Sequence, residues 1–251
     1  MEKKKVPASS SKKSEKSAPS KSAAKSVPAK PVAPPVSATI VVGCAGFPVP
    51  ATRYFQDLAF VEVQDQIPGI GTVRRWRKEA PPGFQFTVLA PKSIASEGFK
   101  LGKETEIAFG TLAEVAKELQ TTTAVFASPP EFLPNKANKQ TIRDFLKVVA
   151  KKYKRVIWDP PPSWKPKEAD ELGEGLSILI ARDPLTVGTN DLSVAYYRLP
   201  GPAGHKSRYE DPAIERLAEI VKAAKNKEAT YVFTNVDMFA DAKRLKKLIG
   251  Q

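Results

Sequence analysis

Residues 60–92 alternate between the patterns of a strand, a helix and a second strand. Both ends of this segment are rich in aromatic and β-branched side chains, which favour strands. Between them, Val73, Trp76 and Ala80 recur at helical spacing, and Thr72 is expected to cap that helix. Two strands joined by a helix form a β–α–β unit, so the sequence predicts strands that pair in parallel.

The same alternation continues along the chain and predicts eight strands. Their centres fall near residues 40, 60, 86, 125, 157, 179, 196 and 232. Helical patterns separate most of them, which predicts a small (β/α)₈ TIM-type barrel over residues 39–251. The 11 residues between Arg182 and Val194 are too few for a full outer helix. An open doubly wound sheet is the alternative, but it more often has fewer strands and longer crossovers.

Residues 1–38 differ from the rest of the chain. They contain nine lysines, two acidic residues and hardly a large apolar side chain, which predicts a disordered basic tail. This tail carries +7 of the net charge of +13, and residues 39–251 carry the remaining +6. Such a tail could bind nucleic acid or a ribosome weakly through phosphate contacts. A solubilising extension is the more ordinary interpretation, because charge alone identifies no partner.

Several classes of protein are excluded by composition. With one cysteine, Cys44, and one histidine, His205, the chain forms no internal disulfide and no multi-Cys or multi-His metal centre. No cofactor motif is present, so we predict no cofactor and no metal. No apolar run approaches the length of a membrane span, and the N-terminus lacks the apolar core of a secretory signal. We therefore expect no membrane association and a cytoplasmic location.

In a parallel barrel, functional groups lie at the carboxyl ends of the strands. Those ends supply Glu62, Gln64, Lys92, Asp159, Arg182, Asp183, Arg198 and Asn235. We expect Glu62 and Arg198 to be the catalytic pair. A carboxylate could act as a general base, and a guanidinium could hold a small anionic ligand in two hydrogen bonds. A structural ion pair at the end of the barrel is an equally good interpretation.

Other side chains have both a functional and an ordinary interpretation. Trp158 could stack on a ligand, although a tryptophan in a strand more often serves packing. Cys44 is better explained as a small buried thiol than as a nucleophile, because no histidine lies nearby in the sequence. A basic patch beside Trp76 could contact phosphates or simply be solvated. That patch consists of Arg74, Arg75, Arg77 and Lys78.

Several short segments resemble the YecE-like proteins, also called domain of unknown function 72. The segments are GCAGF (43–47), the strand–helix–strand of 60–92, FASPPEF (126–132), PPPSW (160–164), YYRLPG (196–201) and VFTN (232–235). They follow the order and spacing of that family across residues 39–250. The resemblance implies a TIM-type barrel and no settled activity.

The resemblance also carries over to particular residues. Glu62, Arg198 and Asn235 match polar positions of the family, and Tyr209 matches by approximate position. Six other family positions that are polar or charged hold different residues here: Gln64, Leu89, Ala127, Trp158, Pro160 and Pro200. The resemblance therefore implies a depleted pocket. With the strand ends, it predicts a ligand-binding set of Gln64, Lys92, Trp158, Arg182, Tyr209 and Asn235.

Two functions follow from these observations, and the sequence assigns no reaction to either. The first is a barrel that binds a small anionic ligand through Glu62 and Arg198, as an enzyme or the remnant of one. The second is a nucleic-acid or ribonucleoprotein-associated protein that uses the tail of residues 1–38.

Overall fold

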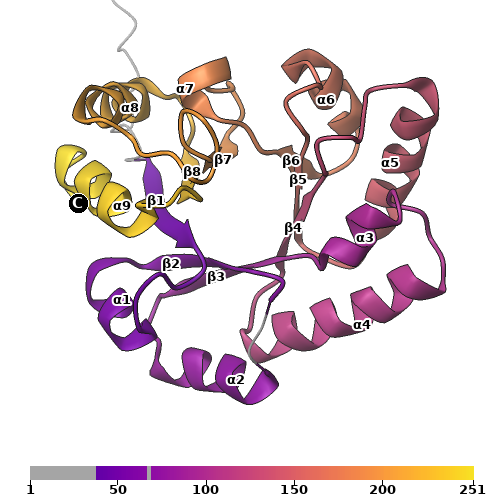
Figure 1. The fold of residues 1–251 in the computed structure, drawn as a ribbon, viewed down its shortest axis with the longest axis horizontal. Helices are drawn as coiled ribbons and strands as arrows, with labels where there is room; N and C mark the ends of the chain where they lie inside the picture. Colours follow the sequence, from indigo (N-terminus) through magenta and orange to yellow (C-terminus); the bar gives the residue numbers. More distant parts are fainter. Residues whose placement is uncertain (1–37, 67–68) are drawn as a thin grey trace, which may run out of the picture. The chain divides into compact units, whose positions relative to one another are not determined.

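The computed structural model describes residues 38–66 and 69–251. Within these residues, eight parallel strands form one sheet in the order β6-β5-β4-β3-β2-β1-β8-β7 (Figure 1). The strands are β1 (Thr39–Ala45), β2 (Phe60–Val63), β3 (Gln85–Leu89), β4 (Thr123–Ala127), β5 (Arg155–Asp159), β6 (Ile178–Ile180), β7 (Val194–Leu199) and β8 (Glu228–Phe233). The predicted disordered tail of residues 1–38 lies outside the described residues, apart from residue 38.

The sheet curls into a nearly closed ring. Strand β1 pairs with both β2 and β8, so the first and the last strand of the barrel are neighbours in the sheet. Beyond β6, Arg182 forms an isolated parallel bridge with Tyr197, and the Arg198 amide donates to the Arg182 carbonyl at 3.1 Å. These contacts join the β6 side to β7. They confirm the TIM-type barrel and exclude the open doubly wound sheet.

Helices surround the ring on its outer side (Figure 1). Those in the described ranges are α1 (Ala51–Asp57), α2 (Ile70–Glu79), α3 (Lys92–Ser96), α4 (Lys103–Glu118), α5 (Lys136–Val149), α6 (Pro166–Gly173), α7 (Pro184–Val187), α8 (Asp211–Ala223) and α9 (Met238–Leu248). The short connection after β6 holds only the four-residue α7, as its length predicted. Helices α1 and α3 were not predicted. The predicted cap at Thr72 is wrong, because α2 begins at Ile70 with Gly69 as its N-cap.

The apolar side chains form two separate layers. The inner layer fills the ring and includes Phe60, Val125, Ile157, Tyr196 and Val232. The outer layer lies between strands and helices and contains most of the other buried apolar residues. Burial of each large side chain in either layer stabilises the fold by about 1.5–3 kcal/mol. Because neighbouring strand residues face opposite layers, this alternation decides which polar side chains reach the interior.

One glycine makes the packing of β1 against β2 feasible. A Cβ atom at Gly43 would lie 2.2 Å from the Phe60 carbonyl oxygen and 2.6 Å from the Phe60 ring. No side chain fits at such distances, so Gly43 lets the Phe60 ring fill the centre of the barrel.

No helix in residues 38–66 and 69–251 has the length and apolar character needed to cross a membrane.

Candidate functional site

A charged cluster occupies the carboxyl end of the barrel interior. It consists of Glu62 from β2, Asp159 from the end of β5 and Arg198 from β7. Phe60, Ile157 and Tyr196 lie two residues earlier on the same strands and belong to the inner layer. Residues two apart on a strand face the same side, so the charged side chains also point into the barrel. They lie above the apolar inner layer, toward the carboxyl ends of the strands.

Arg198 binds both carboxylates at once. Its Nη2 donates to Glu62 Oε1 at 2.8 Å, and its Nη1 donates to Asp159 Oδ2. Glu62 also accepts from the Tyr196 hydroxyl at 2.8 Å and from Gln64 Nε2 at 3.1 Å. Three side chains thus donate to the Glu62 carboxylate, which leaves it little capacity for a further partner.

The three charged side chains differ in their access to solvent. Glu62 is fully buried, whereas the side chain of Arg198 is 13% exposed and that of Asp159 is 24% exposed. Glu62 therefore lies beneath Arg198, and Asp159 is the carboxylate that a molecule entering from solvent would meet. Glu62 was expected to be the acid–base group, and the structure makes Asp159 the more accessible of the two carboxylates.

The pKa values of two groups show how the cluster is stabilised. Burial lowers the pKa of Arg198, but the charges of Glu62 and Asp159 outweigh this effect and raise it above its usual value. Burial, and then the charge of Glu62, raises the pKa of Tyr196 well above its ordinary value. Arg198 therefore stays cationic and Tyr196 stays a hydrogen-bond donor at neutral pH.

The cluster has an excess of negative charge, because one guanidinium faces two carboxylates. The rim around it is built from small side chains: Ala45 and Ala127 end β1 and β4 and are half-buried. The arrangement can hold hydrogen-bond donors at Asp159. Both Nη atoms of Arg198 are paired, and its buried Nε has no hydrogen-bond partner within the described part of the chain.

Three of the predicted ligand-binding residues lie away from this cluster. Lys92 is exposed at the start of α3, and its amide donates to Asp65 at 3.3 Å. Trp158 is fully buried in the outer layer, where its indole donates to Ser128 Oγ at 2.8 Å. Arg182 extends to Asp170 of α6. Of the predicted set, the structure brings only Gln64 into contact with the Glu62–Arg198 pair.

The remaining two, Tyr209 and Asn235, belong to a separate network near α9. Asn235 is buried, and its Nδ2 donates to Asp241 Oδ2 at 2.7 Å. Arg244 donates to Asp241 at 2.6 Å and to the Tyr209 carbonyl at 2.7 Å. The Tyr209 hydroxyl accepts from the Gly201 amide at 2.8 Å. These bonds tie the loop after β7 to α9, which gives both side chains a structural explanation.

Cys44, His205 and the basic patch of α2 have ordinary environments. Cys44 is fully buried, and burial raises the pKa of its thiol to about 12, which keeps the thiol protonated. His205 is exposed, with Nδ1 2.8 Å from the Thr234 carbonyl oxygen. In the patch on α2, Arg74 pairs with Glu118 at 2.9 Å, and Arg75 lies 4.0 Å from Glu79.

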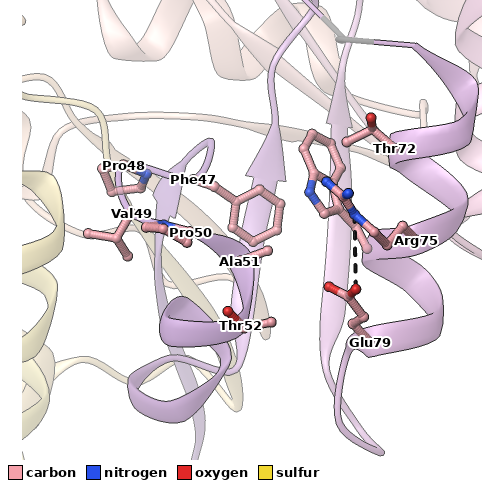
Figure 2. Close-up of a pocket in the computed structure, with 10 residues that line it drawn as sticks. Phe47, Pro48, Val49, Pro50, Ala51, Thr52, Thr72, Arg75 and Glu79 are labelled. Carbon is pink, nitrogen blue, oxygen red and sulfur yellow. Dashed lines mark ion pairs between the residues drawn. The ribbon is translucent and has the colours of Figure 1, made fainter.

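A groove of about 660 Å³ opens between the loop after β1 and helix α2 (Figure 2). Phe47 and Trp76, whose ring centroids lie 4.8 Å apart, line this groove together with the Arg75–Glu79 pair. Phe47 also packs on Tyr54 of α1, so this groove lies on the outer side of the ring. It includes neither Glu62 nor Arg198.

Two residues of the cluster were not selected from the sequence. Asp159 is one of eight polar residues at strand ends, and nothing in its local sequence distinguishes it from the others. Tyr196 precedes Arg198 by two residues, so strand alternation alone places both on one face. That spacing was the signal that could have identified Tyr196 as a partner of the charged pair.

Eight parallel strands, outer helices and a polar cluster at the carboxyl end define a TIM-type barrel protein. The family model described as "Protein of unknown function DUF72" matches residues 52–251. The chain belongs to the DUF72 family, as the resemblance implied. None of the curated proteins matches it.

Solved structures of the family have the same fold. A DUF72 family protein of Enterococcus faecalis V583 superimposes with a TM-score of 0.68 and 18% identity, covering 85% of this chain and 96% of that one. A DUF72 family protein of Thermotoga maritima MSB8 gives a TM-score of 0.66 and 17% identity, covering 85% and 100%. At such identities the likeness concerns the fold alone.

Proposed function

We propose that this barrel binds a small polar ligand at its carboxyl end, through Asp159 and the exposed part of Arg198. The observation that carries the proposal is the Arg198 guanidinium held between buried Glu62 and partly exposed Asp159. A cluster with several buried charges is costly to assemble, and such clusters concentrate at functional sites.

The charge of the cluster favours a ligand with hydrogen-bond donors over the anionic ligand that the sequence predicted. An anion would have to displace Asp159 from Arg198 and would then lie beside two carboxylates. Coulomb repulsion in a partly buried site opposes this arrangement. A hydroxyl-rich or amine ligand, by contrast, can donate to Asp159 while Arg198 keeps both of its partners.

Glu62 acts in this proposal as a positioning residue. It is covered by Arg198 and occupied by three donors, so it fixes the guanidinium rather than contacting the ligand. If the site performs acid–base chemistry, Asp159 is the group placed to exchange a proton with the ligand. No reaction is assigned.

The test is a thermal-shift measurement with two donor-rich probes, myo-inositol and putrescine, and with inorganic phosphate as the anionic probe. We expect at least one donor-rich probe at millimolar concentration to raise the Tm of the wild-type chain, and phosphate to leave it unchanged. Asp159→Asn should abolish the shift. Glu228→Gln, at the opposite end of the barrel, is the matched control and should retain it.

Two results would contradict the proposal. A rise in Tm with phosphate that disappears in Arg198→Lys would restore the anionic ligand. An equal response of the wild type and Asp159→Asn to every probe would place binding elsewhere. The nucleic-acid alternative rests on residues 1–38, of which the structure describes only residue 38. That alternative and a cytoplasmic location stay predictions from the sequence.

A further inference from the structure

The net charge of the folded region is concentrated in one segment. Residues 136–154 contain seven basic residues and one acidic residue, Asp144. Residues 39–251 contain 31 basic and 25 acidic residues, so 24 of each remain once this segment is set aside. The whole excess of +6 therefore lies on α5 and the turn that follows it.

Five of these cations form a stripe along the helix and into the turn that follows it. They are Lys136, Lys139, Arg143, Lys147 and Lys151, spaced three or four residues apart, which we call the α5 stripe. Such spacing places side chains on one face of a helix. The opposite face is buried through Ile142, Phe145, Leu146 and Val149, so the stripe points away from the barrel. Lys152 and Lys154 extend the positive charge beyond the helix and are exposed.

Most of these cations lack a neutralising partner. Lys139 pairs with Glu168 at 2.8 Å, and Lys147 pairs with Asp144 at 3.0 Å. Within residues 38–66 and 69–251, no carboxylate lies within 4.0 Å of Lys136, Arg143 or Lys151. The basic patch of α2 differs, because Arg74 and Arg75 there face carboxylates.

The composition of the exposed face restricts what could bind it. None of the large exposed apolar side chains of the described residues lies on α5, whereas a helix that lies in a membrane surface needs an apolar face. The stripe also lacks an aromatic side chain, which a platform for stacking single-stranded bases requires. What remains is a row of cations suited to the phosphates of a duplex.

We propose that the α5 stripe is a docking surface for the sugar–phosphate backbone of a double-stranded nucleic acid. The contacts are to phosphates, so binding is independent of base sequence and strongly dependent on salt. The helical part of the stripe, from residue 136 to residue 149, covers about 20 Å, comparable with six base pairs of a duplex. This surface is distinct from the carboxyl end of the barrel, and the proposal does not depend on the ligand proposed there.

The experiment uses the full chain and a 24-base-pair DNA duplex of arbitrary sequence, with the dissociation constant measured by fluorescence anisotropy over a series of salt concentrations. The test variant is the triple substitution Lys136→Gln, Arg143→Gln and Lys151→Gln. Its matched control is Lys222→Gln, Lys225→Gln and Lys227→Gln, which removes the same charge from exposed lysines at α8 and the turn after it, on the other side of the ring (Figure 1).

We expect the test variant to lower the slope of log K against log salt by about 3 and to weaken binding on the order of tenfold or more. The control should change both quantities much less. Equal effects of the two triple variants would show that duplex binding depends on the net charge of the chain alone, which would overturn the proposal. An unchanged slope in the test variant would also overturn it, since binding would then belong to the rest of the chain. Binding of phosphatidylserine vesicles with no binding of the duplex would assign the stripe to membranes instead.

Discussion

The two ends of the barrel interior each carry an arginine–carboxylate ion pair, and the two differ in burial and in the number of carboxylates. At the amino end, Arg155 of β5 and Glu228 of β8 pair across the ring through both guanidinium Nη atoms, with 35% of each side chain exposed. At the carboxyl end, Arg198 pairs with buried Glu62 and with Asp159.

The difference shows what each pair contributes. The lower pair is balanced in charge and about one third exposed to solvent, as expected of an ion pair that only joins two strands. The upper cluster has one more carboxylate than cation, and it requires Tyr196 and Gln64 as additional donors. The additional carboxylate at Asp159 has no counterpart in the lower pair, and the binding proposal rests on it.

Removal of the upper arginine should have the largest effect. Arg198→Met leaves Glu62 buried without its counterion, which should lower the free energy of unfolding by about 3–5 kcal/mol. Urea denaturation followed by circular dichroism measures this loss. A loss below about 1 kcal/mol would mean that water reaches Glu62 and that the two ends of the barrel are alike.

Tyr196→Phe should have the next largest effect, and it should depend on pH. Loss of the hydrogen bond to Glu62 should cost about 1.5–3 kcal/mol at neutral pH. The raised pKa of Tyr196 means that the native state keeps this proton while the unfolded state loses it above about pH 10. Wild-type stability should therefore fall faster than that of Tyr196→Phe above pH 10, and the gap between them should narrow. Urea denaturation at several alkaline pH values measures the gap; a constant gap would show that Tyr196 ionises as easily in the native state.

The matching substitution at the lower end should have a small effect. Arg155→Met removes an ion pair that is more than a third exposed, so we expect a loss of about 0.2–1 kcal/mol in the same urea experiment. A loss equal to that of Arg198→Met would break the comparison, because it would make the lower pair as important for folding as the upper cluster.

The smallest expected effect is that of salt. Exposed charges are screened within about 3 Å at 1 M ionic strength, whereas buried pairs are screened much less. The effect of Arg155→Met on stability should therefore shrink by a few tenths of a kcal/mol in 1 M sodium chloride, and that of Arg198→Met should stay constant. Urea titrations at two salt concentrations measure both. An equal dependence on salt would place the upper cluster in solvent.

The fold could be predicted from the sequence because its evidence is local. Each strand is a short run of β-branched and aromatic residues, and the apolar spacing of α4, α5 and α8 is visible without coordinates. The missed helices α1 and α3 are five to seven residues long, too short for a periodic pattern. The cap of α2 was misplaced because a glycine with φ of 128° at Gly69 lets the helix begin earlier.

The site could be predicted only in part, because it depends on which strands face one another. Glu62 and Arg198 were correctly expected to be near each other at the carboxyl end, and they lie 2.8 Å apart. The sequence does not reveal that Arg198 bridges to Asp159, since that contact joins β5 to β7 across 39 residues. Nor does it reveal that Trp158 faces the outer layer, because the sequence does not show which residues of β5 point into the barrel and which point outward.

The most direct test is a pair of double-mutant cycles on the free energy of unfolding, one for Glu62→Gln with Arg198→Met and one for Glu228→Gln with Arg155→Met. The upper cycle should give a coupling energy of about 2 kcal/mol or more, and the lower cycle about 0.5 kcal/mol or less. Equal coupling energies, or a larger one at the lower end, would contradict a buried charged cluster at the carboxyl end of the barrel.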